Sequence, residues 1–210
     1  MSRPAARGCL IAFEGTEGAG KSTHIRHVAE MLRGDGHRVE VTAEPGGTAL
    51  GAQLRDLLLH RLDSAPRPLA ELFLYLADRA QHVEQVIAPA LAAGCVVLTD
   101  RFSPSTIAYQ GYGRGLDLDE LRRADAWARG GVSPQLVILL DCPVRVGLQR
   151  ARGSDRFHAE LEAFHERVRR GFQAEAAAAA ALWRVVDASQ PEEVVRAAVL
   201  DAVRNHLRGQ

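Results

Sequence analysis

The chain has 210 residues, a length that suits one α/β domain, residues 1–210, and is too short for two sizeable domains. Its 26 basic and 26 acidic residues balance, so no overall charge draws the chain to nucleic acid or to a membrane surface. This balance favours small anionic ligands that are bound by locally gathered arginines.

The first predicted strand and helix flank a glycine-rich loop. Cys9–Phe13 is a short apolar run typical of a buried parallel strand, and Ser22–Leu32 carries apolar residues at helical spacing. The loop between them matches the pattern G-x-x-x-x-G-K-[ST] at every fixed position. Its residues are Gly15, Thr16, Glu17, Gly18, Ala19, Gly20, Lys21 and Ser22. Such a loop cradles phosphates with its backbone N–H groups at the N-terminus of the helix.

The loop lysine, Lys21, is the only lysine of the chain, because every other one of the 26 basic residues is arginine. Its compact and flexible ammonium reaches β- and γ-phosphate oxygens at a place where a planar guanidinium would fit badly. The hydroxyl of Ser22 suits Mg²⁺, which prefers oxygen ligands. The loop therefore predicts a nucleotide site, whereas a chance match of a glycine-rich turn would lack the flanking strand and helix.

A second strand, a turn and a helix follow. Arg38–Thr42 alternates polar and apolar residues, as a strand with one buried face does. Glu44–Thr48 then combines Pro45 with two glycines, a composition typical of a sharp turn close to a ligand. Thr48 is the predicted N-cap of a helix that extends to His60.

The next two elements lead to a pair of charged residues. From Pro68 to Ala93 the apolar residues keep a helical period, which predicts a long helix bent at Pro89. Cys95–Thr99 is a third buried strand, and Asp100 and Arg101 stand at its carboxyl end. Ligands bind at the carboxyl ends of the strands in open α/β sheets, so these two residues are candidates for a site.

The middle of the chain continues with a polar, glycine-containing segment, Phe102–Gly115, and a predicted helix over 118–129. Gln135–Asp141 is the fourth strand, and Pro143 opens the helix that follows it. That helix runs into residues 150–156, an arginine-rich stretch that we expect to be a mobile loop.

The last predicted elements are a helix over 159–181, a strand over 183–186 and a closing helix over 191–207. Strands that alternate with helices predict a parallel sheet covered by helices on both faces. We therefore expect an α/β fold of three layers around a five-stranded parallel sheet.

The cysteines point to a reducing compartment. Cys9, Cys95 and Cys142 fall in or beside predicted buried strands and lack the spacing of metal ligands. We interpret them as reduced core thiols, which favours a cytoplasmic protein. No apolar run reaches the length of a secretory signal or a membrane span, so we expect neither export nor membrane attachment.

Five motifs together resemble those of bacterial thymidylate kinases, over nearly the whole chain. They are the loop Gly15–Ser22, the turn Glu44–Thr48, Tyr75 four residues before Arg79, the triplet Asp100-Arg101-Phe102, and the run Ala108–Gly111. Each motif is weak alone, but their order and spacing are specific. The resemblance implies a P-loop NTPase fold with a short lid over residues 150–156. It also implies transfer of the γ-phosphoryl group of ATP to thymidine monophosphate (dTMP) with Mg²⁺, in dTTP biosynthesis, by a homodimer.

The resemblance implies the following roles around the donor, ATP. The loop amides, Lys21 and the adjoining Thr23 hold the ATP phosphates, while Ser22 with Asp100 holds Mg²⁺. Arg101 bridges the donor and acceptor phosphates. The lid arginines supply positive charge over the transferring group, and they are Arg150, Arg152 and Arg156. Phosphoryl transfer needs positioning and charge neutralisation more than covalent help, which makes such a set sufficient.

Around the acceptor, the resemblance implies that Arg55 and Arg79 clamp the phosphate and that Tyr75 stacks on thymine. Thr106 and Gln110 address the edge of the base. The remaining implied substrate contacts are Glu17 at the 3′-hydroxyl, Ser105, and Tyr109, which crowds the 2′ position. This chain departs from its relatives at Ala43, where they usually have arginine before the turn.

Two alternatives remain beside a thymidylate kinase. A deoxynucleoside kinase shares the loop and the sheet, but it needs a base to activate a hydroxyl, and the arginines at positions 55, 79 and 101 disfavour it. An ATP-binding module without turnover shares the same motifs and is separated only by assay. A guanine-binding switch with an Asn-Lys-x-Asp motif is excluded, because the one lysine lies in the phosphate loop.

Overall fold

The computed structural model describes residues 8–60, 66–151, 157 and 160–209. Five parallel strands form one sheet in the order β2-β3-β1-β4-β5, which confirms the predicted five-stranded parallel sheet. The strands are β1 (Cys9–Glu14), β2 (Val39–Ala43), β3 (Val96–Asp100), β4 (Leu136–Asp141) and β5 (Trp183–Asp187). Each strand ends within one residue of its predicted limits.

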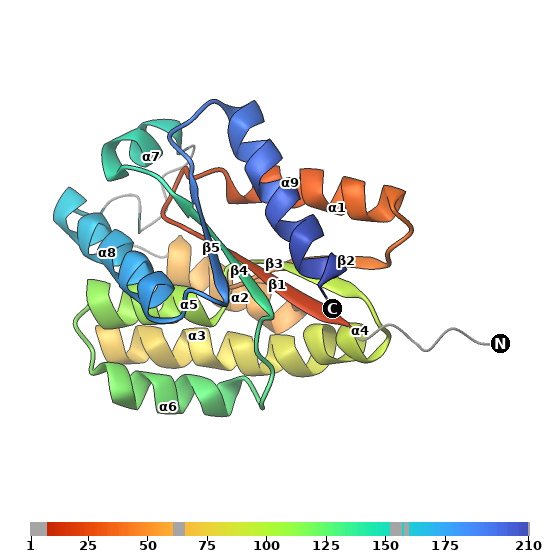
Figure 1. Ribbon diagram of the computed structural model, residues 1–210. Coiled ribbons are helices and arrows are strands. Elements are labelled where there is room, and N and C mark those ends of the chain that lie inside the picture. The colour runs from red at the N-terminus through yellow and green to blue at the C-terminus, as the bar shows by residue number, and fades with distance from the viewer. Residues whose placement is uncertain (1–7, 61–65, 152–156, 158–159, 210) are drawn as a thin grey trace.

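Helices cover both faces of this sheet, as predicted. Figure 1 shows α1 and α9 on one face and α3 and α8 on the other. The helical segments are α1 (Lys21–Gly34), α2 (Ala49–Leu59), α3 (Pro68–His82), η2 (Val83–Ile87), α4 (Ala88–Ala92), α5 (Ser103–Thr106), η3 (Ile107–Gly113), α6 (Leu118–Ala128), α7 (Val144–Arg150), α8 (Glu162–Ala178) and α9 (Glu192–Arg208). No helix among the described residues is long and apolar enough to cross a membrane.

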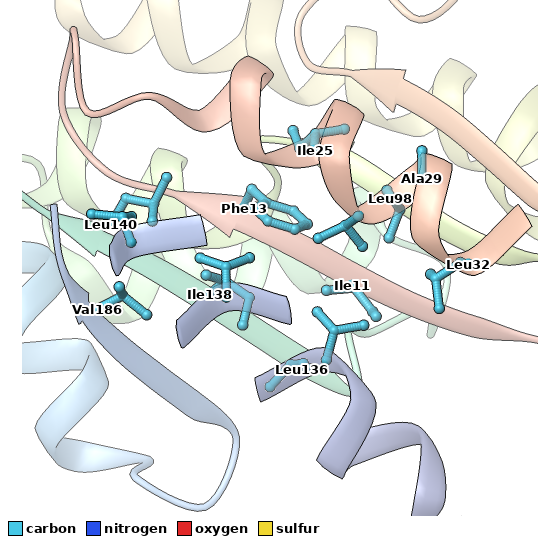
Figure 2. Close-up of a cluster of buried hydrophobic side chains, with 14 of the residues drawn as sticks. Ile11, Phe13, Ile25, Ala29, Leu32, Leu98, Leu136, Ile138, Leu140 and Val186 are labelled. Atoms are coloured by element: carbon cyan, nitrogen blue, oxygen red, sulfur yellow. The ribbon is translucent and has the colours of Figure 1, made fainter. Parts of the chain in front are cut away.

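The central strand β1 contributes to two separate cores. Successive side chains of a strand point to opposite faces, so Ile11 and Phe13 pack toward α1 and α9, while Leu10 and Ala12 pack toward α8. Figure 2 shows the first of these cores, with Phe13 near Ile25 of α1 and Ile11 further along the strand, toward Leu32 of α1. A strand that is buried on both faces reads as a continuous apolar run, which is the pattern that identified it.

The predicted long helix from Pro68 is not uniform. It is α-helical over α3, widens into a π-helical turn over η2, and continues as the short α4, which contains Pro89. Proline has no N–H to donate to the preceding turn, and the wider turn just before it accommodates that loss. The expected irregularity at Pro89 therefore takes the form of a change in helical pitch.

The polar segment Phe102–Gly115 is helical for most of its length. The short α5 and the π-helical η3 together cover residues 103–113 and pack against α8. Tyr109 and Gln110 are buried there. Its polar side chains lie inside the molecule, where a ligand or another polar group has to satisfy them.

Three further predictions concern helix ends. Thr48 is the N-cap of α2, and its hydroxyl accepts a hydrogen bond from Gly51 N at 2.9 Å, as predicted. The helix expected over 159–181 is α8, which is shorter at both ends. Arg150, expected in a mobile loop, is instead the last residue of α7, whereas Arg152 and Arg156 lie outside the described residues.

Candidate active site

A cavity of about 990 Å³ opens at the carboxyl ends of β1 and β3. This is the edge of the sheet at which ligands bind in folds of this class. The predicted site residues that line it are Glu17, Gly18, Gly20, Lys21, Ser22, Thr23, Arg55, Tyr75, Arg79, Asp100, Arg101, Ser105, Thr106, Tyr109, Gln110 and Arg150. Gly15, Thr16 and Ala19 of the loop do not line it. One cavity thus brings together residues from both halves of the predicted site.

The glycine-rich loop adopts a backbone that other residues rarely take. Gly15 and Gly20 have φ angles of 140° and 92°, and Gly20 directly precedes the first turn of α1. Lys21 lies in that turn, and its Nζ donates to the carbonyls of Gly15 and Thr16, each at 3.0 Å. Burial and the neighbouring charge of Arg101 lower the pKa of Lys21 to about 8. The ammonium is therefore held at the mouth of an anion-binding helix terminus.

An oxygen pair lies next to the loop. Ser22 Oγ donates to Asp100 Oδ2 at 2.7 Å, which joins α1 to the end of β3. A hydroxyl and a carboxylate are ligands that suit Mg²⁺, which commonly keeps several waters and substrate oxygens besides one or two protein ligands. No cluster of three or more acidic, histidine or cysteine side chains that would enclose a metal occurs among the described residues.

Arg101 lies between the loop and the segment after β3. Its φ angle is 71°, a left-handed conformation that costs a residue other than glycine about 1–3 kcal/mol. Nη1 donates to Gly15 O and Ser105 Oγ, each at 3.1 Å, and Nη2 donates to Tyr109 Oη at 3.0 Å. Such strain persists only where surrounding contacts fix it, and it is most common at functional sites.

Glu14 supplies one of those fixing contacts, although the sequence did not single it out. Its carboxylate accepts hydrogen bonds from Phe102 N at 2.9 Å and from Ser105 Oγ at 2.6 Å. Burial raises the pKa of Glu14 to about 7, against the opposing effect of the bond from Ser105. The one sequence signal for this role was that Glu14 is an acidic residue at the end of an otherwise apolar strand.

The loop residue Glu17 is held from two sides. Its Oε1 accepts from Tyr109 Oη at 2.6 Å and from Arg101 Nη2 at 3.3 Å. Its Oε2 lies 3.1 Å from Nδ1 of the buried His165 on α8, although these atoms are not aligned for a hydrogen bond. Burial raises the pKa of Glu17, but the contact with His165 and the charge of Arg101 outweigh it and lower that pKa well below its usual range.

The Tyr109 ring is both a wall of the cavity and part of the core. It packs edge-on against three phenylalanines, with ring-centroid distances of 5.3 Å to Phe157, 6.1 Å to Phe164 and 6.1 Å to Phe172. Burial raises the pKa of its hydroxyl well above the usual value. Tyr109 therefore stays a neutral, firmly positioned ring.

Arg79 is buried in a network of ion pairs rather than exposed on a helix surface. Nε and Nη2 contact Glu44 Oε2, each at 2.8 Å, and Nη1 contacts Asp125 Oδ1 at 2.6 Å and Thr106 Oγ1 at 2.8 Å. The guanidinium also lies 5.2 Å from the ring centroid of Phe102. Two carboxylates thus neutralise a side chain that is 2% exposed.

Replacing Arg79 with alanine is expected to lower the free energy of unfolding by about 3 kcal/mol, because Glu44 would lose its buried arginine and Asp125 would keep only its ion pair with Arg129. Urea denaturation measures this loss. Arg123→Ala is the matched control, since Arg123 forms an exposed pair with Glu120 and should change stability little. A loss below about 1 kcal/mol for Arg79→Ala would mean that the network contributes little to the fold.

The other predicted residues lie on the same cavity. Arg55 of α2 donates from Nη1 to Pro45 O at 2.9 Å, so the turn that follows β2 holds its guanidinium. Arg150 donates from Nη1 to Ala188 O at 2.7 Å, which ties the end of α7 to the loop after β5. The cavity is also lined by Glu44, Pro45 and Gly46 of the turn predicted to lie close to a ligand, and by Ala151 of the predicted lid. The lining residues for which the sequence predicted no role in a site are Ala43, Leu59, Phe157 and Glu192.

Comparisons with known proteins agree with this geometry. The family model described as thymidylate kinase matches residues 13–199. The thymidylate kinase of Desulfovibrio desulfuricans is 50% identical over 209 residues, which are 95% of this chain and 96% of that protein. Those of Geotalea daltonii and a Synechococcus species are 47% and 52% identical, over 96% and 87% of this chain and 99% and 96% of theirs. The chain, with its phosphate loop and arginine-lined cavity, therefore belongs to the thymidylate kinase family.

Proposed function

We propose that the protein transfers the γ-phosphoryl group of ATP to thymidine 5′-monophosphate, giving ADP and thymidine 5′-diphosphate in the synthesis of dTTP. The observation that carries this proposal is Arg101, which lies in one cavity between the phosphate loop and the polar face of α5 and η3. In the reaction an acceptor phosphate oxygen forms a bond to the γ-phosphorus. At the same time the bond between the γ-phosphorus and the β,γ-bridging oxygen breaks, and that oxygen leaves with ADP. That acceptor oxygen is already anionic, so no catalytic base is needed.

On the donor side, the loop amides, Lys21 and Thr23 bind the ATP phosphates. Ser22 and Asp100, joined at 2.7 Å, fit Mg²⁺ because both offer oxygen ligands beside the loop. When bound, Mg²⁺ neutralises charge on the β- and γ-phosphate oxygens. Arg150 lines the same cavity at the end of α7, which lies against Gly18 of the loop, and Arg152 and Arg156 stay predicted lid residues.

On the acceptor side, Arg55 and Arg101 are better placed to clamp the phosphate than Arg79. Arg79 already faces two carboxylates, so its charge is matched before substrate enters. Its contact with Thr106 instead places it beside a residue predicted at the edge of the base. We therefore assign the phosphate to Arg55 and Arg101, whose planar forks grip phosphate oxygens in pairs.

The sugar and base contacts follow the same arrangement. Glu17, held by Arg101 and Tyr109, accepts from the 3′-hydroxyl, and the Tyr109 ring occupies the space that a 2′-hydroxyl needs. Tyr75 stacks on thymine, and Thr106 and Gln110 meet its edge. Ser105 acts through Arg101 and Glu14, since its hydroxyl is bonded to both.

Tyr109→Ala is expected to weaken discrimination against ribose by about tenfold to a hundredfold, because it opens the space beside the 2′ carbon. The measurement is the ratio of kcat/KM for dTMP over its ribo counterpart. Tyr109→Phe is the matched control, since it keeps the ring and should keep the ratio. A lowered Tm with an unchanged ratio in Tyr109→Ala would assign Tyr109 to packing alone.

The choice of acceptor tests the proposal against its alternatives. Purified protein with ATP and Mg²⁺ should phosphorylate dTMP and leave thymidine untouched. A deoxynucleoside kinase would do the reverse, and an ATP-binding module would give product with neither. The arginines of the cavity favour a phosphate-bearing acceptor, because a hydroxyl acceptor needs a general base in their place.

We also propose a homodimer through α2 and α3. These adjacent helices carry four exposed apolar side chains: Leu50 (45% exposed), Leu57 (36%), Leu69 (55%) and Phe73 (58%). Exposed apolar side chains on helices that contact each other, as α2 and α3 do, are a feature of interfaces. The assignment of residues 1–210 to a single domain and the cytoplasmic location both stay predictions. The three cysteines are free, which agrees with their interpretation as reduced thiols.

A further inference from the structure

The amide of Gln110 has a fixed orientation in the cavity. Its Nε2 donates to Glu71 Oε1 at 2.7 Å, and Glu71 lies fully buried on α3. A carboxylate oxygen accepts and has no N–H to donate, so the nitrogen of the amide has to face Glu71. Its oxygen, Oε1, then faces away from Glu71, and the hydrogen bonds of the described residues include no protein donor to it. Gln110, which lines the cavity, thus offers it an acceptor.

Arg114 holds Glu71 in this accepting role. Its Nε donates to Glu71 Oε1 and its Nη2 to Oε2, each at 3.2 Å. An arginine has only donors, so both oxygens of Glu71 act as acceptors. Arg114 is itself fixed by Glu160 at 2.6 Å and by the Phe164 ring, whose centroid lies 4.6 Å from the guanidinium carbon. Gln110 therefore cannot turn its amide without losing a bond to a buried charge.

The neighbouring Thr106 has the opposite polarity. Arg79 Nη1 donates to Thr106 Oγ1 at 2.8 Å, so the hydroxyl oxygen accepts from the protein. Its hydrogen has no acceptor among the described residues and can be donated to a ligand. Thr106 precedes Gln110 by four residues in one helical stretch, which brings the two side chains to the same face. That face presents a donor beside an acceptor.

We propose that Glu71 determines base specificity, by fixing Gln110 as a hydrogen-bond acceptor in the base site of the proposed function. A 2,4-dioxopyrimidine offers the complementary edge, with a C4 carbonyl that accepts and an N3–H that donates. A 4-aminopyrimidine such as cytosine offers the reverse at both positions. It would leave buried polar groups of the protein unpaired, and this is the situation that gives strong discrimination.

The test replaces Glu71 with glutamine, whose NH₂ can donate to Gln110 and so permits the turned amide. We expect the ratio of kcat/KM for dTMP over dCMP to fall at least about tenfold, with the KM for ATP close to that of the wild type. Glu160→Gln is the matched control: it removes the other carboxylate on Arg114, leaves the Glu71–Gln110 bond, and should keep the ratio. If Glu71→Gln lowered kcat/KM for dTMP and for dCMP by the same factor, Glu71 would act in packing only and the proposal would be overturned.

Gln110→Ala separates this proposal from the proposed function. If it leaves the dTMP to dCMP ratio unchanged, the base does not meet Gln110 and the proposed base site is wrong. If it lowers the ratio while Glu71→Gln does not, the role of Glu71 is overturned and the base site stands. Because Glu71 acts through Gln110, the double variant E71Q/Q110A should match Gln110→Ala alone, and a further loss would contradict the proposal.

The exchange variant E71Q/Q110E keeps the test decisive should Glu71→Gln fail to fold. Its residue 71 amide donates to a carboxylate at position 110, whose other oxygen still presents an acceptor to the base. Preference for dTMP should persist in this variant. A ratio as low as that of Gln110→Ala would overturn the proposal.

Discussion

Lys21→Ala is expected to lower kcat at least about 10²- to 10³-fold, because it removes the charge that the proposed function assigns to the transferring phosphoryl group. The fold should persist, since the hydrogen bonds of Lys21 Nζ go to two carbonyls of its own loop, Gly15 O and Thr16 O. Steady-state kinetics with saturating ATP and dTMP measures the change. A variant that keeps half of the wild-type rate would contradict the donor-site assignment.

Lys21→Arg is a sharp companion to this variant. It keeps the charge but replaces the compact ammonium, which contacts the carbonyls of Gly15 and Thr16, with a planar fork of different reach and geometry. We expect a loss of kcat close to that of Lys21→Ala. Recovery of most of the rate by arginine would mean that charge alone, rather than the reach of lysine, is required. Thermal denaturation of both variants confirms that the comparison is made on folded protein.

Arg101→Ala should cause the second largest loss, about 10²-fold or more in kcat, because Arg101 joins the two sides of the cavity that we assign to the donor and the acceptor. Its Nη1 contacts Gly15 of the loop and Ser105 of α5, so its removal affects both substrates. We expect lower kcat/KM for ATP and for dTMP together. A loss confined to one substrate would contradict the bridging role.

Two variants control for the backbone and the overall charge. Arg101→Lys keeps a positive charge and a side chain at a position whose φ angle is 71°, but it lacks the planar guanidinium. Its rate therefore shows whether charge alone is sufficient or the geometry of arginine is required. Arg123→Ala removes one exposed arginine that does not line the cavity and should leave kinetics unchanged. If Arg123→Ala reduced the rate as Arg101→Ala does, the effect would be one of net charge.

The sheet and the phosphate loop were predictable because their signals are local. β1, β3 and β4 are continuous apolar runs, and the loop needs glycines at fixed spacing whatever the rest of the chain does. The helical character of residues 103–113 was not predicted. Polar side chains that face a ligand break the apolar period by which helices are recognised, so local patterns fail where function is concentrated.

The ion pairs of the site were not predictable from local patterns either. Arg79 meets Glu44, 35 positions earlier, and Asp125, 46 positions later, and Glu71 meets Gln110 across 39 positions. Sequence spacing carries no information about such partners, because only the fold brings them together. The sequence therefore suggested that Arg79 binds the acceptor phosphate, whereas in the structure Arg79 is paired with two buried carboxylates.

The most direct test of the central claim is a coupled assay that measures ADP release under saturating ATP and Mg²⁺, with each nucleoside monophosphate as acceptor in turn. We expect rapid release with dTMP, much weaker release with dCMP and the purine monophosphates, and none above background with thymidine. ADP release that no monophosphate stimulates, or that thymidine stimulates in place of dTMP, would contradict the account.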